Sequence, residues 1–460
     1  MLVAAAAIVQ NGAKLDFAFS RRRPVTSNDK QLAAARKIAA LIAPHLQGDL
    51  SLQLWNGEVV PLGPGARDDV RIVVRSPGAI RRLLLKPSLM NVFELYADGE
   101  LDITGAAPLD ATLRWDHLKA LHLKDTVDKV AVAKAALPFL TWRAPPQVPV
   151  LGFTNEAGSV YGKDRRDQEM VSYHYDVSDA FYALFLDREM VYSAGYFESE
   201  DDSVDQAQIV KMDRICKKLQ LAPGKRMLDI GCGWGGLACY AAKNYGVDVY
   251  GMTLSKRQHA YAQEKIAAMG LKDKVRIDLK DYREIVAGEP FDAIAQIEMF
   301  EHVGLDNHDR HFAHINRLLK TRGTYLHQAM TRRAPMDLSK FRKRTAYAKV
   351  LQRYIFPGYE LDHLGMTITN LERHGFEVHD VDNMREHYHL TLRRWADRLW
   401  ANREAAIAEA GLQRTRLWLL YLALVCRGFD RGPVLVYQTL ATKRDLGRSG
   451  LPLARKNWFK

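Results

Sequence analysis

The chain has 460 residues, of which 47% are hydrophobic and 26% are charged. This length exceeds one ordinary hydrophobic core and predicts two domains, and this composition excludes an intrinsically disordered chain. The net charge of +12 favours an anionic partner, either nucleic acid or an acidic membrane surface.

The four cysteines form no C-x-x-C pair, and no histidine cluster accompanies them at zinc spacing. We therefore expect no disulfide framework, no metal site and a reducing, cytoplasmic location. The first ten residues, MLVAAAAIVQ, form a short apolar stretch with no basic residue before it, which argues against a signal peptide. No run approaches the ~20 apolar residues that span a bilayer, so any membrane contact is expected to be peripheral, at the inner membrane surface.

The pattern of residues divides the chain into four regions. Residues 1–30 are expected to be poorly ordered, and residues 31–120 to form a small α+β domain. The elements expected in that domain are a helix over Leu32–Leu41, strands over Leu50–Trp55, Val70–Val74 and Leu101–Ile103, and a helix that begins at Ser76 and Pro77. Residues 121–164 are expected to be a helical connector, with a proline-rich linker at 142–153.

Residues 165–460 alternate helical patterns with short apolar runs typical of buried strands. The runs are Arg226–Ile230, Val247–Gly251, Val275–Leu279, Phe291–Ile297 and Thr324–His327. This alternation predicts an α/β fold, with a parallel sheet covered by helices on both faces.

The strongest motif is MLDIGCGWGG at 227–236. Asp229 ends the first strand, and Gly231, Gly233 and Gly235 follow in the spacing D-x-G-x-G-x-G. Glycines there let the backbone turn sharply and approach a ligand, because no Cβ stands in the way. The spacing differs from the dinucleotide fingerprint and resembles the first motif of Rossmann-like class I methyltransferases, whose loop holds the amino-acid part of S-adenosylmethionine (SAM). The resemblance implies that the α/β unit is a class I methyltransferase sheet. The alternative is a tight turn with no ligand.

Two weaker signals follow the next strands. Thr253 and Gln258 offer a hydroxyl and an amide for the ribose, although Ser255 could simply cap a helix that leaves Gln258 exposed. Asp281 and Tyr282 suit the amine and the face of adenine, and the alternative is a loop carboxylate beside a packed ring.

Several motifs together resemble the cyclopropane-fatty-acid synthase and mycolic-acid methyltransferase family. They are HYDVSDAFYALFLD (174–187), MLDIGCGWGGLA (227–238), MTLSKRQ (252–258), QIEMFEHVG (296–304) and YIFPGYE (354–360). The resemblance covers residues 165 to about 440. The preceding domain is similar to the extra, sterol-carrier-like domain of the branch that modifies bacterial phospholipids.

The resemblance implies roles for individual residues. SAM contacts are implied for Tyr192, Ser193, Asp229, Gly231, Gly233, Gly235, Thr253, Leu254 and Gln258. Glu301, His327 and Tyr388 match the residues that hold a bicarbonate ion in the family's active site. Ala194 stands where a cysteine of that site is expected, and Cys426 lies one place beyond the position of a family cysteine, so it is given no role as a nucleophile.

The activity that the resemblance implies is transfer of the SAM methyl carbon to the cis double bond of an unsaturated phospholipid acyl chain. Bicarbonate then removes a proton from the added methyl, and a cyclopropane ring closes. Such a reaction must exclude water and hold a base close to the new methyl. The altered sequence at Ala194 keeps open a methylene- or methyl-branched product.

The basic charge has a matching use. Basic residues cluster just after His327, and apolar residues interleave with them: Arg332, Arg333, Met336, Leu338, Lys340, Phe341, Arg342, Lys343 and Arg344. This pattern predicts a surface for anionic lipid headgroups, and the alternative is a solvated loop.

Other functions fit the sequence less well. A small-molecule N-methyltransferase has no use for a bicarbonate site, and the intact glycine loop argues against an inactive lipid-binding module. No base-reading motif or set of stacking aromatic residues is evident, so nucleic acid is not an expected partner. The sequence leaves a homodimer open.

Overall fold

The computed structural model describes residues 29–46, 48–114, 127–140, 149–154, 162–163, 167–175, 177–286 and 288–458. The chain divides into two compact units. The first comprises residues 1–152, 344–354 and 403–424, and the second comprises residues 153–343, 355–402 and 425–460. Most of the expected N-terminal segment (1–28), much of the connector and linker (115–126, 141–148 and 155–161) and Phe459 lie outside the described residues. The domain boundaries expected from the sequence stay predictions.

The first unit contains a four-stranded sheet in the order β2-β1-β3-β4. Its strands are β1 (Ser51–Gln53), β2 (Val59–Pro61), β3 (Arg71–Val74) and β4 (Leu101–Thr104). β1 pairs antiparallel with β2 and parallel with β3, and β3 pairs antiparallel with β4.

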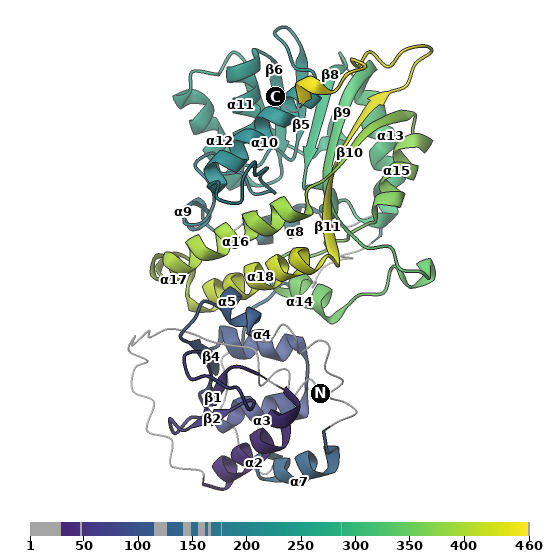
Figure 1. Ribbon diagram of the computed structural model, residues 1–460. Helices are drawn as coiled ribbons and strands as arrows, with labels where there is room; N and C mark the ends of the chain where they lie inside the picture. The colour runs from purple at the N-terminus through teal and green to yellow at the C-terminus, as the bar shows by residue number, and fades with distance from the viewer. Residues whose placement is uncertain are drawn as a thin grey trace. The chain divides into compact units, whose positions relative to one another are not determined.

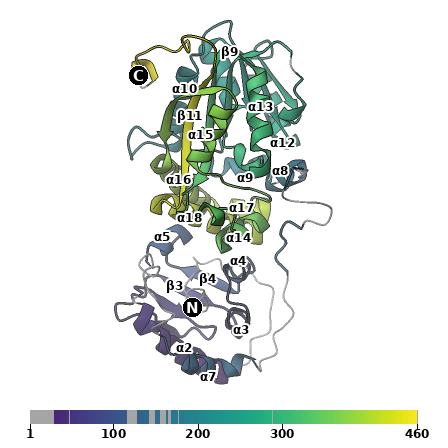
Figure 2. The same ribbon diagram turned by 90° about the vertical axis from the view of Figure 1, so that its right-hand side faces the viewer.

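The helices of the first unit come from three parts of the chain. They are α2 (Asp29–Leu46), α3 (Pro77–Leu85), α4 (Leu89–Ala97), α5 (Pro108–Leu113), α7 (Lys129–Leu140), α14 (Ala346–Tyr354), α17 (Arg403–Ala410) and residues 412–424 of α18 (Leu412–Arg431). α3 begins where the sequence predicts, because Ser76 caps the amide of Gly78 and Pro77 occupies the first turn. α2 and α7 lie side by side over one apolar core (Figure 2).

The second unit contains a seven-stranded sheet in the order β10-β11-β9-β8-β5-β6-β7. Its strands are β5 (Arg226–Ile230), β6 (Asp248–Thr253), β7 (Val275–Leu279), β8 (Phe291–Ile297), β9 (Leu319–Arg332), β10 (Phe376–Asn383) and β11 (Val434–Lys443). Neighbouring strands pair in parallel from β7 to β9, and β11 runs antiparallel between β9 and β10.

Helices cover both faces of this sheet (Figure 1). Side chains alternate between the faces along each strand, so Met227 packs with one helical layer and Leu228 with the other. The first layer contains α10 (Val204–Lys218), α11 (Gly236–Tyr245) and α12 (Lys256–Ala268), and the second contains α13 (His308–Leu318) and α15 (Leu364–Arg373). The predicted fold class, a class I methyltransferase sheet preceded by a small α+β unit, is therefore confirmed.

The remaining helices of the second unit lie near the ends of the strands or complete α18. They are α8 (Asp167–Tyr175), α9 (Asp179–Ala183), α16 (Arg385–Ala401) and residues 425–431 of α18. Among the described residues, no helix combines the length and the apolar character needed to cross a membrane.

Candidate cofactor and catalytic site

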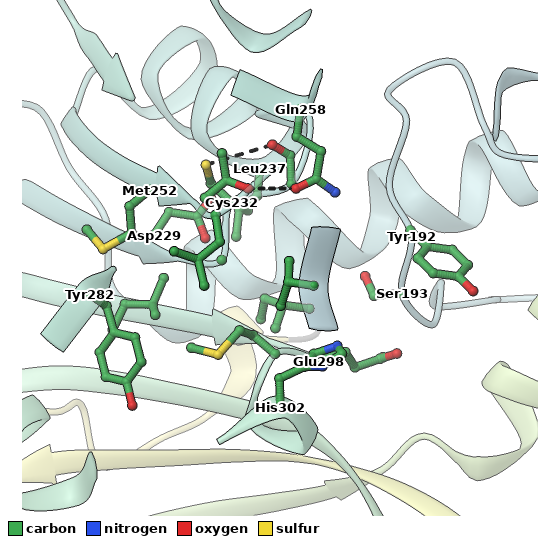
Figure 3. Close-up of a pocket in the computed structure, with 18 of the residues that line it drawn as sticks. Tyr192, Ser193, Asp229, Cys232, Leu237, Met252, Gln258, Tyr282, Glu298 and His302 are labelled. Carbon is green, nitrogen blue, oxygen red and sulfur yellow. Dashed lines mark hydrogen bonds between the residues drawn. The ribbon is translucent and has the colours of Figure 1, made fainter. Parts of the chain in front are cut away.

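A cleft lies in the second unit, at the carboxyl ends of the parallel strands. Ligands of open α/β sheets bind at this edge. In Figure 3, Tyr282 and Met252 lie on one side of the cleft, and Tyr192 and Ser193 lie on the other. Of the residues predicted to bind SAM, Tyr192, Ser193, Asp229, Gly231, Gly233, Thr253, Leu254, Gln258, Asp281 and Tyr282 line the cleft. Gly235 is not among the lining residues.

The three glycines of the loop all have left-handed backbone conformations, but they serve different needs. At Gly231 (φ +74°) a Cβ would stand 2.8 Å from Met299 Cγ, and at Gly235 (φ +80°) it would stand 3.2 Å from Ile277 Cδ1. At Gly233 (φ +56°) no described atom lies within 4 Å of that position. Gly231 and Gly235 therefore allow close packing, whereas Gly233 keeps cleft space open for a ligand.

Asp229 lies one residue before the end of β5 and offers a carboxylate to a cationic ligand. Its side chain is buried, and among the described residues its Oδ2 atom has no hydrogen-bond partner. Burial raises the pKa of this carboxyl to about 7, although the Lys211 ammonium opposes the rise. A buried, unsatisfied carboxylate at the glycine loop fits the cationic amino-acid part of SAM.

Gln258 is placed by the start of α12. Ser255 caps this helix by accepting the Gln258 amide, as the alternative interpretation had it. That interpretation also expected Gln258 to be exposed, and this expectation is wrong. The Gln258 side chain is buried and accepts a 2.7 Å hydrogen bond from Thr253 Oγ1. The Thr253–Gln258 pair thus presents fixed polar groups to the cleft (Figure 3).

Asp281 and Tyr282 follow β7 and are both anchored. Asp281 accepts the amide of Arg283 and pairs with its guanidinium. The Tyr282 hydroxyl lies 2.9 Å from His311 Nδ1, and the two rings meet edge to face. The pair therefore offers an ordered carboxylate and an aromatic ring at one side of the cleft.

On the opposite side, Ser193 contacts a buried lysine that belongs to none of the sequence motifs. Lys211 on α10 donates a 2.7 Å hydrogen bond from Nζ to Ser193 Oγ. Burial lowers the pKa of Lys211 to about 8. The neighbouring Tyr192 ring packs between the rings of His174 and Trp395. These contacts fix the 192–193 segment beside the cleft.

The three residues predicted to hold bicarbonate lie outside the lining of the cleft and have different surroundings. Glu301 is buried and accepts the backbone amide of Met330, while its Oε2 atom has no described partner. His327 points to the α13 layer, where its Nδ1 lies 3.1 Å from the Tyr325 hydroxyl and its ring packs on Phe300.

Tyr388 on α16 is buried against Phe429 and Trp395. Burial raises the pKa of Glu298, and hydrogen bonding from the Tyr388 hydroxyl offsets part of that rise. The role of Glu301, His327 and Tyr388 in holding bicarbonate stays a prediction.

Comparison with known proteins identifies the family to which the chain belongs. A model of the family described as mycolic acid cyclopropane synthetase matches residues 162–439. The chain belongs to this family of SAM-dependent methyltransferases. It is 33% identical, over 92% of its length and 100% of the relative's, to a probable fatty acid methyltransferase of Pseudomonas putida. It is 34% identical, over 84% of its length and 90% of the relative's, to a probable fatty acid methyltransferase of Mycobacterium tuberculosis.

A solved structure of the family shows the same catalytic fold. The mycolic acid cyclopropane synthase CmaA1, complexed with S-adenosylhomocysteine (SAH) and CTAB, matches with a TM-score of 0.56 and 34% identity. The match covers 60% of this chain and 98% of CmaA1. As a member of this SAM-dependent family, the chain has in Asp229, Gly233 and the Thr253–Gln258 pair groups suited to hold SAM.

Among the other residues that line the cleft of this mycolic acid cyclopropane synthetase family member, two lie next to each other (Figure 3) and were given no role from the sequence. They are His302, which ends a short 3-10 helix (Phe300–His302), and Glu298, which directly follows β8. Figure 3 shows both side by side in the wall of the cleft. A carboxylate just after a buried strand is the signal that could have identified Glu298, because the carboxyl ends of parallel strands form the ligand site.

Proposed function

We propose that this chain transfers the methyl carbon of SAM to the cis double bond of an unsaturated acyl chain in a membrane lipid. The observation that carries the proposal is one cleft that joins a SAM-type glycine loop and Asp229 to the acid Glu298. The names of the two methyltransferase relatives support a fatty acyl substrate.

SAM supplies an electrophilic methyl group, and an isolated alkene that attacks it becomes a cation. The protein must then keep water away from the cation and hold a base near the added methyl. Aromatic rings surround this part of the second unit: Tyr175, Tyr182, Tyr192 and Trp234 pack against one another at centroid distances of 4.9–6.5 Å. Such a wall excludes water and accommodates an apolar chain.

The family resemblance predicts a cyclopropane ring, with bicarbonate held by Glu301, His327 and Tyr388 as the base. A methylene- or methyl-branched chain is the second candidate product. One observation favours it: Ala194 replaces the expected cysteine, and its amide is already engaged by Glu298 at 2.9 Å. The anion site of this chain therefore differs from the one that the ring-forming resemblance implies.

We also propose that the lipid is reached at an anionic membrane surface. In the second unit, Met336 and Leu338 are exposed in a segment that also carries Arg333, Lys340 and Lys343. Arg332 stacks on Phe341, and Arg342 pairs with Asp306 at 2.8 Å, so these contacts hold the segment in place. Exposed apolar side chains among cations suit a headgroup surface.

Mass spectrometry of lipids tests the proposal. The purified chain is incubated with SAM and vesicles of dioleoylphosphatidylglycerol, and its acyl chains should gain one CH2. Ozonolysis then distinguishes the products, because it cleaves a methylene branch and leaves a cyclopropane intact. If no acyl chain gains carbon while calorimetry shows that SAM is bound, the proposed substrate class is wrong.

A further inference from the structure

Glu298 has an unusual backbone for a glutamate. It directly follows β8 with φ +50°, in the left-handed region that residues with a Cβ rarely adopt. Such a conformation persists where the surrounding structure holds it, and it is concentrated at functional sites. Here it places a carboxylate in the wall of the cleft, below Ser193 and beside His302 (Figure 3).

The surroundings of this carboxylate supply hydrogen-bond donors. Its Oε1 atom accepts a 2.9 Å hydrogen bond from the amide of Ala194 and a 2.7 Å hydrogen bond from Gln328 Nε2. Gln328 is itself oriented, because its Oε1 accepts from Gln438 Nε2 at 3.0 Å. Together with the Tyr388 hydroxyl, these donors favour an ionised side chain at position 298. Burial opposes them and raises the pKa of Glu298 overall, which makes the carboxylate a stronger base.

Glu301, the second acid of the QIEMFEHVG motif (296–304), differs from Glu298 in its protonation. Burial, followed by the charge of Glu298, raises the pKa of Glu301 to about 8, so Glu301 is largely neutral at pH 7. The two acids therefore differ in their surroundings, because the amide of Ala194 and Gln328 Nε2 both donate to Glu298 and so favour negative charge there rather than on Glu301. This arrangement does not fit a bicarbonate ion, because a second anion would meet that charge and would find the amide of Ala194 already occupied.

We propose that the Glu298 carboxylate is the base of the reaction, and that it replaces the external bicarbonate ion. The inference rests on the proposed function, since it needs the cation that forms when the alkene takes up the methyl group. One C–H bond of the added methyl breaks, its proton passes to a Glu298 oxygen, and its electron pair closes the ring. When a hydride first shifts between the two former alkene carbons, the same proton transfer gives a methylene branch.

The test compares four proteins in bicarbonate-depleted buffer, with vesicles of dioleoylphosphatidylglycerol: the full-length chain, Glu298→Gln, Glu298→Gly and Glu377→Gln. The last is a charge-matched control on an exposed position of β10. The unmodified chain and the control should turn over without bicarbonate. Glu298→Gln should be about 10²–10⁴-fold slower, the usual contribution of a general base. Glu298→Gly, which suits the left-handed backbone, should be equally slow and should partly recover with added acetate or bicarbonate.

Two further measurements separate a catalytic role from a structural one. Calorimetry should show SAH affinities of both variants within about threefold of the unmodified chain. Infrared difference spectra at pH 7 should show that Glu298→Gln removes an ionised carboxylate. The inference is overturned if Glu298→Gln keeps turnover within tenfold, if the unmodified chain requires bicarbonate, or if the lost band is that of a neutral acid. If the unmodified chain binds SAH and methylates no lipid, the proposed function itself fails.

Discussion

A methyl side chain at Gly233 should weaken SAM binding more than it destabilises the protein. Gly233 lines the cleft, and no described atom lies within 4 Å of the position its Cβ would take. The left-handed backbone of an alanine there costs ~1–2 kcal/mol, so Gly233→Ala should lower the free energy of unfolding by about that much. Because the methyl enters space that the ligand needs, affinity should fall at least about tenfold, which is ~1.4 kcal/mol of binding free energy.

Gly235→Ala is the matched control. Gly235 has a similar left-handed backbone, but its Cβ would meet Ile277 Cδ1 at 3.2 Å and Ala262 Cβ at 3.3 Å. Overpacking adds ~1–3 kcal/mol to the conformational cost, so this variant should lose more stability and less affinity. Urea unfolding and calorimetric titration with SAH measure both quantities. The assignment of the loop is refuted if Gly233→Ala binds SAH as tightly as the unmodified chain.

Three other outcomes are expected. SAM affinity should rise between about pH 6 and pH 8 as Asp229, whose pKa is about 7, ionises, and Asp229→Asn should abolish this rise in a calorimetric pH series. Glu301 has a pKa of about 8, so its ionisation should lower the activity of the unmodified chain above pH 8. Glu301→Gln should keep turnover at pH 7 and remove that loss, whereas a large loss at pH 7 would instead support the bicarbonate role. Replacing Arg333, Lys340 and Lys343 by alanine should weaken co-sedimentation with anionic vesicles by about 1 kcal/mol per residue, and unchanged binding would contradict the membrane surface.

Strands that are buried on both faces could be predicted closely. The expected ranges 226–230 and 291–297 coincide with β5 and β8, because such strands are largely apolar runs between turns. The expected range 275–279 coincides with β7, an edge strand in which buried and exposed residues alternate. β10 and β11 were not predicted. In β10, at the edge of the sheet, charged residues alternate with apolar ones. Whether such a segment forms a strand depends on pairing with a partner strand far away in the chain, here β11.

The position of the candidate cofactor residues around the cleft could be predicted, because glycine spacing reports backbone geometry directly. The surroundings of the candidate catalytic residues were harder to predict, because a shift of one position along a strand moves a side chain to the opposite face of the sheet. His327 points to α13, whereas the next residue, Gln328, points to the opposite side and bonds Glu298. Nothing in the sequence reveals that Glu298 takes a left-handed backbone, which depends on its surroundings.

The interleaving of the two units has a consequence for synthesis of the chain on the ribosome. The first unit includes residues 344–354 and 403–424, and within it Arg416 donates a 2.9 Å hydrogen bond to Asp102 while the Tyr354 hydroxyl donates to Glu94. Those partners emerge long after residue 152. At 5–20 residues per second, the roughly 270 residues up to 424 take about 15–50 s to translate. During that interval the amino-terminal sheet lacks the helices formed by residues 344–354 and 403–424 and is open to chaperones. The first unit therefore begins to be synthesised first but is completed only near the end of translation.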